Sequence, residues 1–233
     1  SNVLVYNFRL KCGSEKVAKQ SLYIPHPEKI DFQISSQYDF KLKESELWMN
    51  LVFNPENKVL FLNHDNLPAL EKVIGEKVEN PTEVELVRQM VESLTLCGVS
   101  ESSIGVMSLY RYHLKSLKRV LISKPDVEVL TADQFQGRDK DCVIISLVRS
   151  NNEKRVGDLL KEWRRVNVAI TRSRSKLILL GSKSTLYNSD TLKGFIDLLN
   201  DRKWIHDLPK DANMFYQFAF QSPETQTGSM RSS

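Results

Sequence analysis

The sequence has 233 residues, of which 41% are hydrophobic and 27% are charged, and its formal net charge is +4. This length suits one domain of the upper usual size, and the composition is that of an ordinary globular protein rather than a disordered or membrane-bound one. No apolar run approaches the roughly 18 residues that span a bilayer, and residues 1–13 lack the features of a signal peptide.

The first 79 residues show little regular periodicity. We interpret residues 1–10 as the end of a helix and residues 12–56 as a loop-rich insertion. The apolar run at residues 57–65 predicts a strand. This part of the chain therefore indicates few regular elements.

From Asn80 onward, helical and strand patterns alternate along the chain. Asn80 is the expected N-cap of a helix that ends at Gly98, with Pro81 at the first helical position and Glu83 completing a capping box. Further helices are expected at residues 111–123, 159–174 and 190–202, and strands at residues 103–110, 126–132, 141–148 and 175–181. Such alternation predicts an α/β fold with a mostly parallel sheet that is covered by helices on both faces.

The C-terminal residues differ in composition from the rest. Residues 210–233 become rich in Ser, Thr and Gln, and we expect them to form a tail that is flexible at its end. Residues 1–209 are then the domain proper.

Polar residues that directly follow the predicted strands are the first candidates for ligand contact, because ligands of such sheets bind beyond the carboxyl ends of the strands. They are Tyr110, Arg111, the loop at residues 131–139, and residues 149–152. The loop is dense in donors and acceptors, but a plain connecting loop is an equally good interpretation.

A cationic cluster extends from Arg138 to Lys176, with eleven Lys and Arg residues against five Asp and Glu. It indicates a phosphate-binding face, although a solvated helical face is an equally good interpretation. Arg174 and Lys176 are explained by the dipole at the end of the 159–174 helix, which stabilises a cation by about 0.3–1 kcal/mol. Arg172 instead shares a helical stripe with Arg165, and its planar guanidinium suits bidentate phosphate recognition.

Other catalytic and metal-binding signatures are missing from the sequence. There is no G-x-x-x-x-G-K-[ST] loop, no Ser/His/Asp arrangement and no HExxH motif, so the domain alone lacks the parts to hydrolyse a nucleoside triphosphate. Three widely spaced cysteines favour reduced thiols in an intracellular protein and suit no metal site. The four histidines are scattered, and we interpret them as structural or exposed.

Two segments carry a resemblance to a known family. TADQFQGRDKDCVIISLVRSN and RRVNVAITRSRSKLILLG resemble motifs V and VI of superfamily 1 helicases, in the group that moves 5′ to 3′ on nucleic acid. IGVMSLYRYHLKSLK is similar to motif IV, and the matches keep the family's order and approximate spacing across residues 1–181. The residues of these segments are most similar to those of the eukaryotic nuclease–helicases that process Okazaki-fragment flaps, and we expect a fungal member.

The resemblance implies that the chain is the second RecA-like motor domain of a nuclear, ATP-dependent DNA helicase and nuclease that acts in DNA replication and repair. The Walker motifs, the nuclease and its iron–sulfur cluster are expected upstream, so ATP and Mg²⁺ are held jointly with the first motor domain and this chain alone is inactive. The implied partners are single-stranded DNA, the upstream domains and a single-strand-binding protein, with no membrane.

The resemblance also implies roles for individual residues. Arg172 is similar to the arginine finger, the catalytic contact to the γ-phosphate. The implied nucleotide contacts are Gln136, Gly137, Asp139 and Arg172, with Asp139 standing where many relatives have Glu. The implied nucleic-acid contacts are Thr131, Tyr110, Arg111 and Arg149. His113 replaces the Gln that is usual in motif IV, and no role is carried over to it.

Two alternatives stay open at this stage. An RNA helicase of the same group has similar motifs, because motors that track the backbone do not reveal their sugar preference in these residues. A non-catalytic module that binds nucleic acid or protein could also keep the fold.

Overall fold

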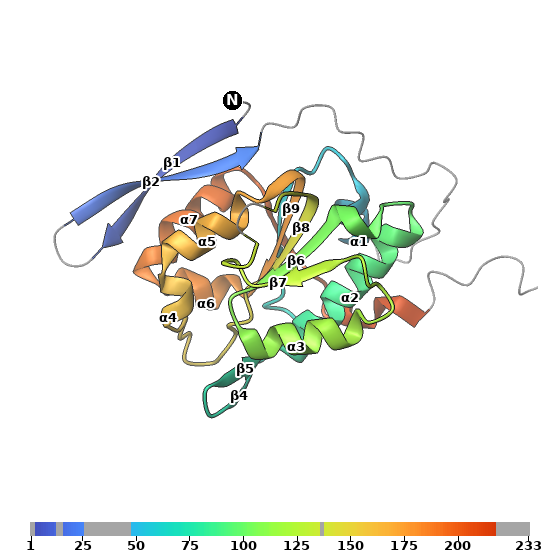
Figure 1. Cartoon of the computed structure of the whole chain (residues 1–233). Coiled ribbons are helices and arrows are strands. Elements are labelled where there is room, and N and C mark those ends of the chain that lie inside the picture. The colour runs from blue at the N-terminus through green and yellow to red at the C-terminus, as the bar shows by residue number, and fades with distance from the viewer. Residues whose placement is uncertain (1–2, 13–15, 26–47, 136–137, 218–233) are drawn as a thin grey trace, which may run out of the picture.

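The computed structural model describes residues 3–12, 16–25, 48–135 and 138–217 of the chain (Figure 1). The predicted nucleotide contacts Gln136 and Gly137 lie outside the described residues. So do residues 26–47 of the predicted insertion and residues 218–233 of the predicted tail.

A six-stranded sheet forms the centre of the domain. Its strands lie in the order β10-β3-β9-β8-β6-β7, and every neighbouring pair is parallel. The strands are β3 (Val59–Asn63), β6 (Ile104–Ser108), β7 (Glu128–Leu130), β8 (Lys140–Ser146), β9 (Ser173–Gly181) and β10 (Ile205–Asp207). β3 and β6 are buried along their whole length, as expected for parallel strands covered on both faces.

Helices cover both faces of this sheet (Figure 1). One face packs against α1 (Trp48–Phe53), α2 (Pro81–Leu96) and α3 (Arg111–Val120). The other packs against α4 (Asp158–Lys161), α5 (Trp163–Ile170), α6 (Lys183–Tyr187) and α7 (Asp190–Asp201). Successive residues of a strand enter opposite cores: Ile144 joins the first, whereas Val143 and Ile145 join the second. The predicted three-layer α/β architecture is confirmed.

The N-terminal residues differ from the prediction. Residues 3–12 are not the end of a helix but strand β1 (Val3–Cys12), which pairs antiparallel with β2 (Lys16–Pro25) from Val3↔Pro25 to Cys12↔Lys16. The physical reason is composition, since β-branched and aromatic residues recur in both segments and favour an extended pleated backbone. β1 lies against α7 and β2 against α5. With α1, these strands also make part of the predicted loop-rich segment regular.

Helix α2 begins as predicted, with Asn80 as its N-cap accepting a hydrogen bond from the Glu83 backbone N–H at 3.1 Å. The second half of the predicted capping box is wrong. The Asn80 backbone N–H donates to Nδ1 of His113 at 3.2 Å instead, and the Glu83 carboxylate points to buried partners elsewhere.

The predicted helix at residues 159–174 is also wrong at its C-terminal end. It divides into α4 and α5, and α5 ends at Ile170. The Lys140 backbone N–H donates to the Arg172 carbonyl at 3.0 Å, and β9 begins with Ser173. The backbone at Arg172 therefore pairs with β8 instead of continuing the helix that the sequence pattern predicted. Arg172 does not share a helical stripe with Arg165.

Four shorter elements complete the described chain. A hairpin of β4 (Lys72–Ile74) and β5 (Lys77–Glu79) turns at Gly75, whose φ is 60°. The 3-10 helices are η2 (Glu101–Ser103) and η3 (Ala212–Gln217). η3 lies within the predicted tail and contacts α2, where Gln89 donates to the Asn213 carbonyl at 2.6 Å.

Candidate functional site

Arg172 lies at the amino edge of the sheet, immediately before β9. Its Nη1 is 3.3 Å from Oδ1 of Asp139, which immediately precedes β8. The Arg172 side chain also donates to the Val168 carbonyl from Nε and to Oγ1 of Thr171 from Nη2, both at 3.3 Å. The side chain is 25% exposed and that of Asp139 is 44% exposed, so both oriented charges are open to a ligand.

The position of Asp139 corrects the expectation that the whole loop at residues 131–139 lies at the carboxyl ends of the strands. Tyr110, Arg111 and Thr131 follow β6 and β7, whereas Asp139 and Arg172 precede β8 and β9. The reason is that residues 131–139 lead from the carboxyl end of β7 to the amino end of β8. The predicted site residues therefore form two groups, on opposite edges of one sheet.

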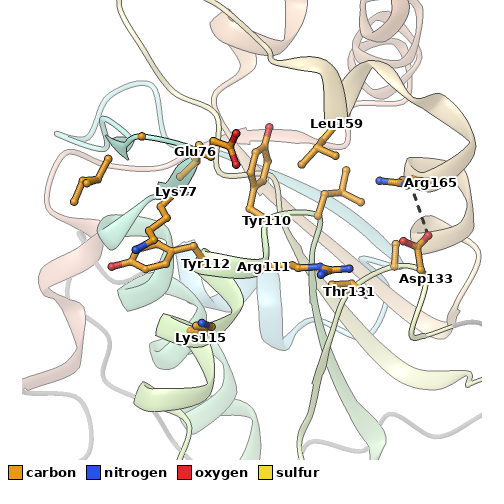
Figure 2. A pocket seen from close by; sticks show the side chains of 15 residues that line it. Glu76, Lys77, Tyr110, Arg111, Tyr112, Lys115, Thr131, Asp133, Leu159 and Arg165 are labelled. Atoms are coloured by element: carbon orange, nitrogen blue, oxygen red, sulfur yellow. Dashed lines mark ion pairs between the residues drawn. The ribbon is translucent and has the colours of Figure 1, made fainter.

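A groove of about 890 Å³ lies at the carboxyl edge (Figure 2). Three of the four predicted nucleic-acid contacts line it: Tyr110, Arg111 and Thr131. Its walls come from the β4–β5 hairpin, the start of α3, the end of β7 and the α4–α5 segment. Its volume lies in the range of about 300–1,000 Å³ that is usual for ligand sites.

Cations and aromatic rings share this groove. The Lys77 ammonium lies 5.6 Å from the centre of the Tyr112 ring. On the other side, Nε of Arg165 is 3.9 Å from Asp133 (Figure 2). The same atom is 3.1 Å from Glu162. Arg111 and Lys115 have no acidic partner within ion-pair distance among the described residues. The carboxylates of Glu76 and Asp133 also line the groove, so its lining holds four cations and two acids beside apolar surface.

Tyr110 and Thr131 have local partners of their own. The Tyr110 hydroxyl donates to the Val156 carbonyl at 3.5 Å, and burial raises the pKa of this phenol to about 12. The Thr131 hydroxyl donates to Oε1 of Gln134 at 3.2 Å and accepts from its backbone N–H at 3.3 Å. Both side chains are therefore held in place at the groove.

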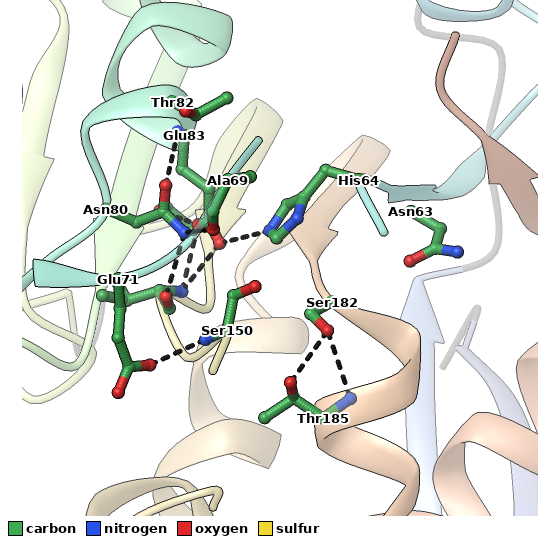
Figure 3. Close-up of polar contacts among 12 residues, drawn as sticks. Asn63, His64, Ala69, Glu71, Asn80, Thr82, Glu83, Ser150, Ser182 and Thr185 are labelled. Carbon is green, nitrogen blue, oxygen red and sulfur yellow. Dashed lines mark hydrogen bonds and ion pairs between the residues drawn. The ribbon is translucent and has the colours of Figure 1, made fainter. Parts of the chain in front are cut away.

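Arg149 is not among the residues that line the groove. Its guanidinium pairs with Glu71 at 2.9 Å and is 15% exposed. It also lies close to Gly157, whose φ is 76°, where an added Cβ would meet Nη1 at 2.6 Å. Glu71 further accepts from the Ser150 backbone N–H at 2.7 Å (Figure 3). Arg149 thus joins the hairpin to the end of β8, and its nucleic-acid contact stays a prediction.

A buried polar network that the sequence did not predict is centred on Glu83. Glu83 accepts hydrogen bonds from the Val148 backbone N–H at 3.0 and 3.1 Å and from the Ser146 hydroxyl, and its Oε1 lies 2.8 Å from Nε2 of His64 (Figure 3). Nε2 of His113 lies 2.7 Å from the Ser146 hydroxyl, and burial lowers the pKa of His113, against the opposing effect of Glu83. The only sequence signal was a carboxylate on the apolar face of a helix. The network ties α2, α3 and β8 together.

Lys176 is not a partner of a helix dipole, because it lies within β9. Its side chain is 1% exposed and donates to the carbonyls of Asn54 and Asn57, both at 2.8 Å. Burial lowers the pKa of this amine to about 8. Arg174, two residues earlier on the same strand, is exposed.

The described residues contain little other reactive chemistry. Cys97 and Cys142 are buried free thiols, and burial raises their pKa values to about 11 and about 12. Among the described residues, no three His, Cys, Asp or Glu side chains gather to hold a metal ion. None of the described helices is both long and apolar enough to cross a bilayer.

Comparison with known proteins now adds to this geometry. The model of the AAA domain family matches residues 1–184. The chain belongs to this family. The match covers most of the six-stranded sheet and both groups of predicted site residues, including Arg172.

Individual relatives are more specific. The chain is 45% identical over 225 residues, 95% of its length, to the DNA replication ATP-dependent helicase/nuclease DNA2 of Saccharomyces cerevisiae. It is 42% identical over 90% of its length to the protein of the same name from Homo sapiens, and 34% identical over 89% to the DNA replication ATP-dependent helicase/nuclease JHS1 of Arabidopsis thaliana. These matches confirm the resemblance seen in the motifs. The chain spans 14%, 20% and 15% of these three relatives.

Proposed function

We propose that this chain is the second motor domain of an ATP-dependent 5′→3′ DNA helicase that also carries a nuclease and processes flaps in nuclear DNA replication and repair. It supplies the arginine finger to ATP and part of the track for single-stranded DNA. The observation that carries the proposal is the division of the predicted contacts between two edges of one continuous six-stranded sheet. Such a layout lets an event at the ATP edge reposition the DNA edge as one body.

The amino edge suits a half-site for ATP. The Arg172 guanidinium is partly exposed and directly precedes a buried strand, and its ion pair within the described residues is with a half-exposed carboxylate. A phosphate group can take over its hydrogen bonds, and an arginine finger contributes about 10³–10⁵ in rate. Asp139, with Gln136 and Gly137 by resemblance, would contact the nucleotide. Bound ATP with Mg²⁺ supplies the transferable phosphoryl group, and the remaining ligands come from the first motor domain.

We assign the Walker motifs and the iron–sulfur cluster to parts of the whole protein other than this chain. This chain has no Walker lysine, so we expect ATP turnover only when the first motor domain is present. The nuclease and its iron–sulfur cluster belong, by the same resemblance, to the upstream part of the protein.

The carboxyl edge suits a single strand. Arg111 and Lys115 provide charge for phosphates, and the Thr131 hydroxyl lies at the end of β7 where a backbone can pass. Phosphate contacts of this kind act on any sequence and release counterions. The relatives act in DNA replication by name, which favours DNA over RNA. A single-strand-binding protein is the expected additional partner.

Polarity of unwinding tests this function in the full-length protein. We expect ATP-dependent separation of a duplex with a 5′ single-stranded tail and little separation of one with a 3′ tail. Binding of oligo-dT and of mixed-sequence strands should weaken together, and steeply, between low and physiological salt. Unwinding from the 3′ tail, or a flat salt response, would contradict the proposal.

A further inference from the structure

The β4–β5 hairpin exposes apolar side chains where the groove opens. Ile74 is 65% exposed and Val73 is 55% exposed, on a hairpin that projects from the carboxyl edge beside α3 (Figure 1). It belongs to none of the helicase motifs that the sequence resembles. Its apolar tip therefore has no explanation in the groove's phosphate contacts alone.

The hairpin is anchored at both ends. At its start, the Glu71 backbone N–H donates to the Ser150 carbonyl at 2.9 Å, and the Glu71 carboxylate binds Arg149. At its end, Glu79 accepts from the Ser116 hydroxyl of α3 at 2.7 Å. Val78, between these anchors, is buried. The tip is thus presented on a fixed base rather than on a loose loop.

The two exposed residues differ in what they face. Successive side chains of a strand point to opposite sides, and Ile74 lines the groove whereas Val73 does not. Ile74 pairs with Lys77, whose ammonium lies over the Tyr112 ring. One wall of the groove therefore combines an aliphatic side chain, an aromatic ring and a cation.

We propose that Ile74 is a base contact of the single-strand track. The phosphates lie toward Arg111 and Lys115 on α3, and a base rests its apolar face against Ile74 beside Tyr112. Charge complementarity selects this occupant: four cations and two carboxylates line the groove. Arg111 and Lys115 have no acidic partner within ion-pair distance among the described residues, and they lie next to apolar surface of the kind a heterocycle covers. The assignment rests on the proposed nucleic-acid function and adds the residue that senses bases.

An abasic scan in the full-length protein tests this contact. A fluorescent oligo-dT would carry one abasic position, moved stepwise through the binding footprint, and affinity would be measured by anisotropy. With the wild-type protein, one position should lower affinity by about 3- to 10-fold, because a buried aliphatic contact is lost there. In Ile74→Thr that step should disappear. Threonine keeps the β-branched shape that strands favour, and the melting temperature of each variant would be compared.

Val73→Thr is the matched control, since it makes a similar change on the same hairpin outside the groove, and it should keep the wild-type profile. A profile unchanged in Ile74→Thr, with binding weakened by joint Arg111→Ala and Lys115→Ala substitution, would overturn the base contact while leaving the track in place. Unchanged binding in that double variant would overturn the track itself. Loss of a protein partner by Ile74→Thr, with DNA binding intact, would overturn the proposal in favour of protein docking.

Discussion

Arg172 and Lys176 come from the same short cationic run, yet the fold places them in opposite environments. Arg172 precedes β9 and presents its guanidinium at the amino edge beside Asp139. Lys176 lies inside the strand, where it donates to two backbone carbonyls and is almost fully buried. The sequence predicted that Arg172, unlike Lys176, contacts a phosphate group. It could not predict the burial of Lys176, because that depends on the residue at which β9 begins.

The buried amine should leave a signature in the pH dependence of stability. The pKa of Lys176 is lowered from 10.5 to about 8 in the folded chain, so between these values the unfolded state binds more protons. Stability then rises with pH across this window. We expect the unfolding free energy of wild type, relative to Lys176→Met, to increase from pH 8 to pH 10.5 in urea titrations. Parallel curves for the two proteins would contradict the lowered pKa.

At the scale of elements, the parallel sheet and its covering helices were predictable because apolar strands alternate with amphipathic helices. The amino end of β9 and the β4–β5 hairpin were not. Arg172 fits a helical continuation locally, but the pairing of β8 with β9, including the hydrogen bond from the Lys140 N–H to the Arg172 carbonyl, places this backbone in the sheet. The hairpin strands have three residues each, too few for a clear period. Glu83 was predicted as a cap, because its partners His64 and Ser146 are distant in sequence.

The Glu83 network should therefore contribute to the stability of this fold. Glu83→Gln leaves the Val148 N–H and the Ser146 hydroxyl with a weaker acceptor and disturbs the contact with His64. We expect the free energy of unfolding to fall by about 1–3 kcal/mol. Glu85→Gln is the control on the same helix, because its partners are Arg88, a partly exposed surface residue, and the Gln89 amide, and surface ion pairs contribute at most about 1 kcal/mol. Thermal melting of both variants measures the difference. Equal melting temperatures would show that the network is not a main support of α2.

At the scale of the whole molecule, one sheet separates the edge that we propose faces the nucleotide from the edge that we propose faces nucleic acid. The sequence indicated both groups of residues through their resemblance to helicase motifs, but it placed Asp139 with the residues that follow the strands, because the path of residues 131–139 across the sheet is a tertiary feature. Family membership and the three relatives fit a motor half of this layout. In the proposed division of roles, Arg172 acts on phosphate and takes no part in strand binding.

Steady-state ATP turnover of the full-length Arg172→Ala variant at saturating single-stranded DNA tests this claim most directly. We predict a fall of about 10³–10⁵-fold, with unchanged melting temperature and single-strand affinity. Arg172→Lys should fail nearly as severely, since an ammonium lacks the planar fork, whereas the exposed control Arg174→Ala should retain turnover. Near-normal turnover in Arg172→Ala, or a loss accompanied by unfolding, would contradict the assignment of the arginine finger.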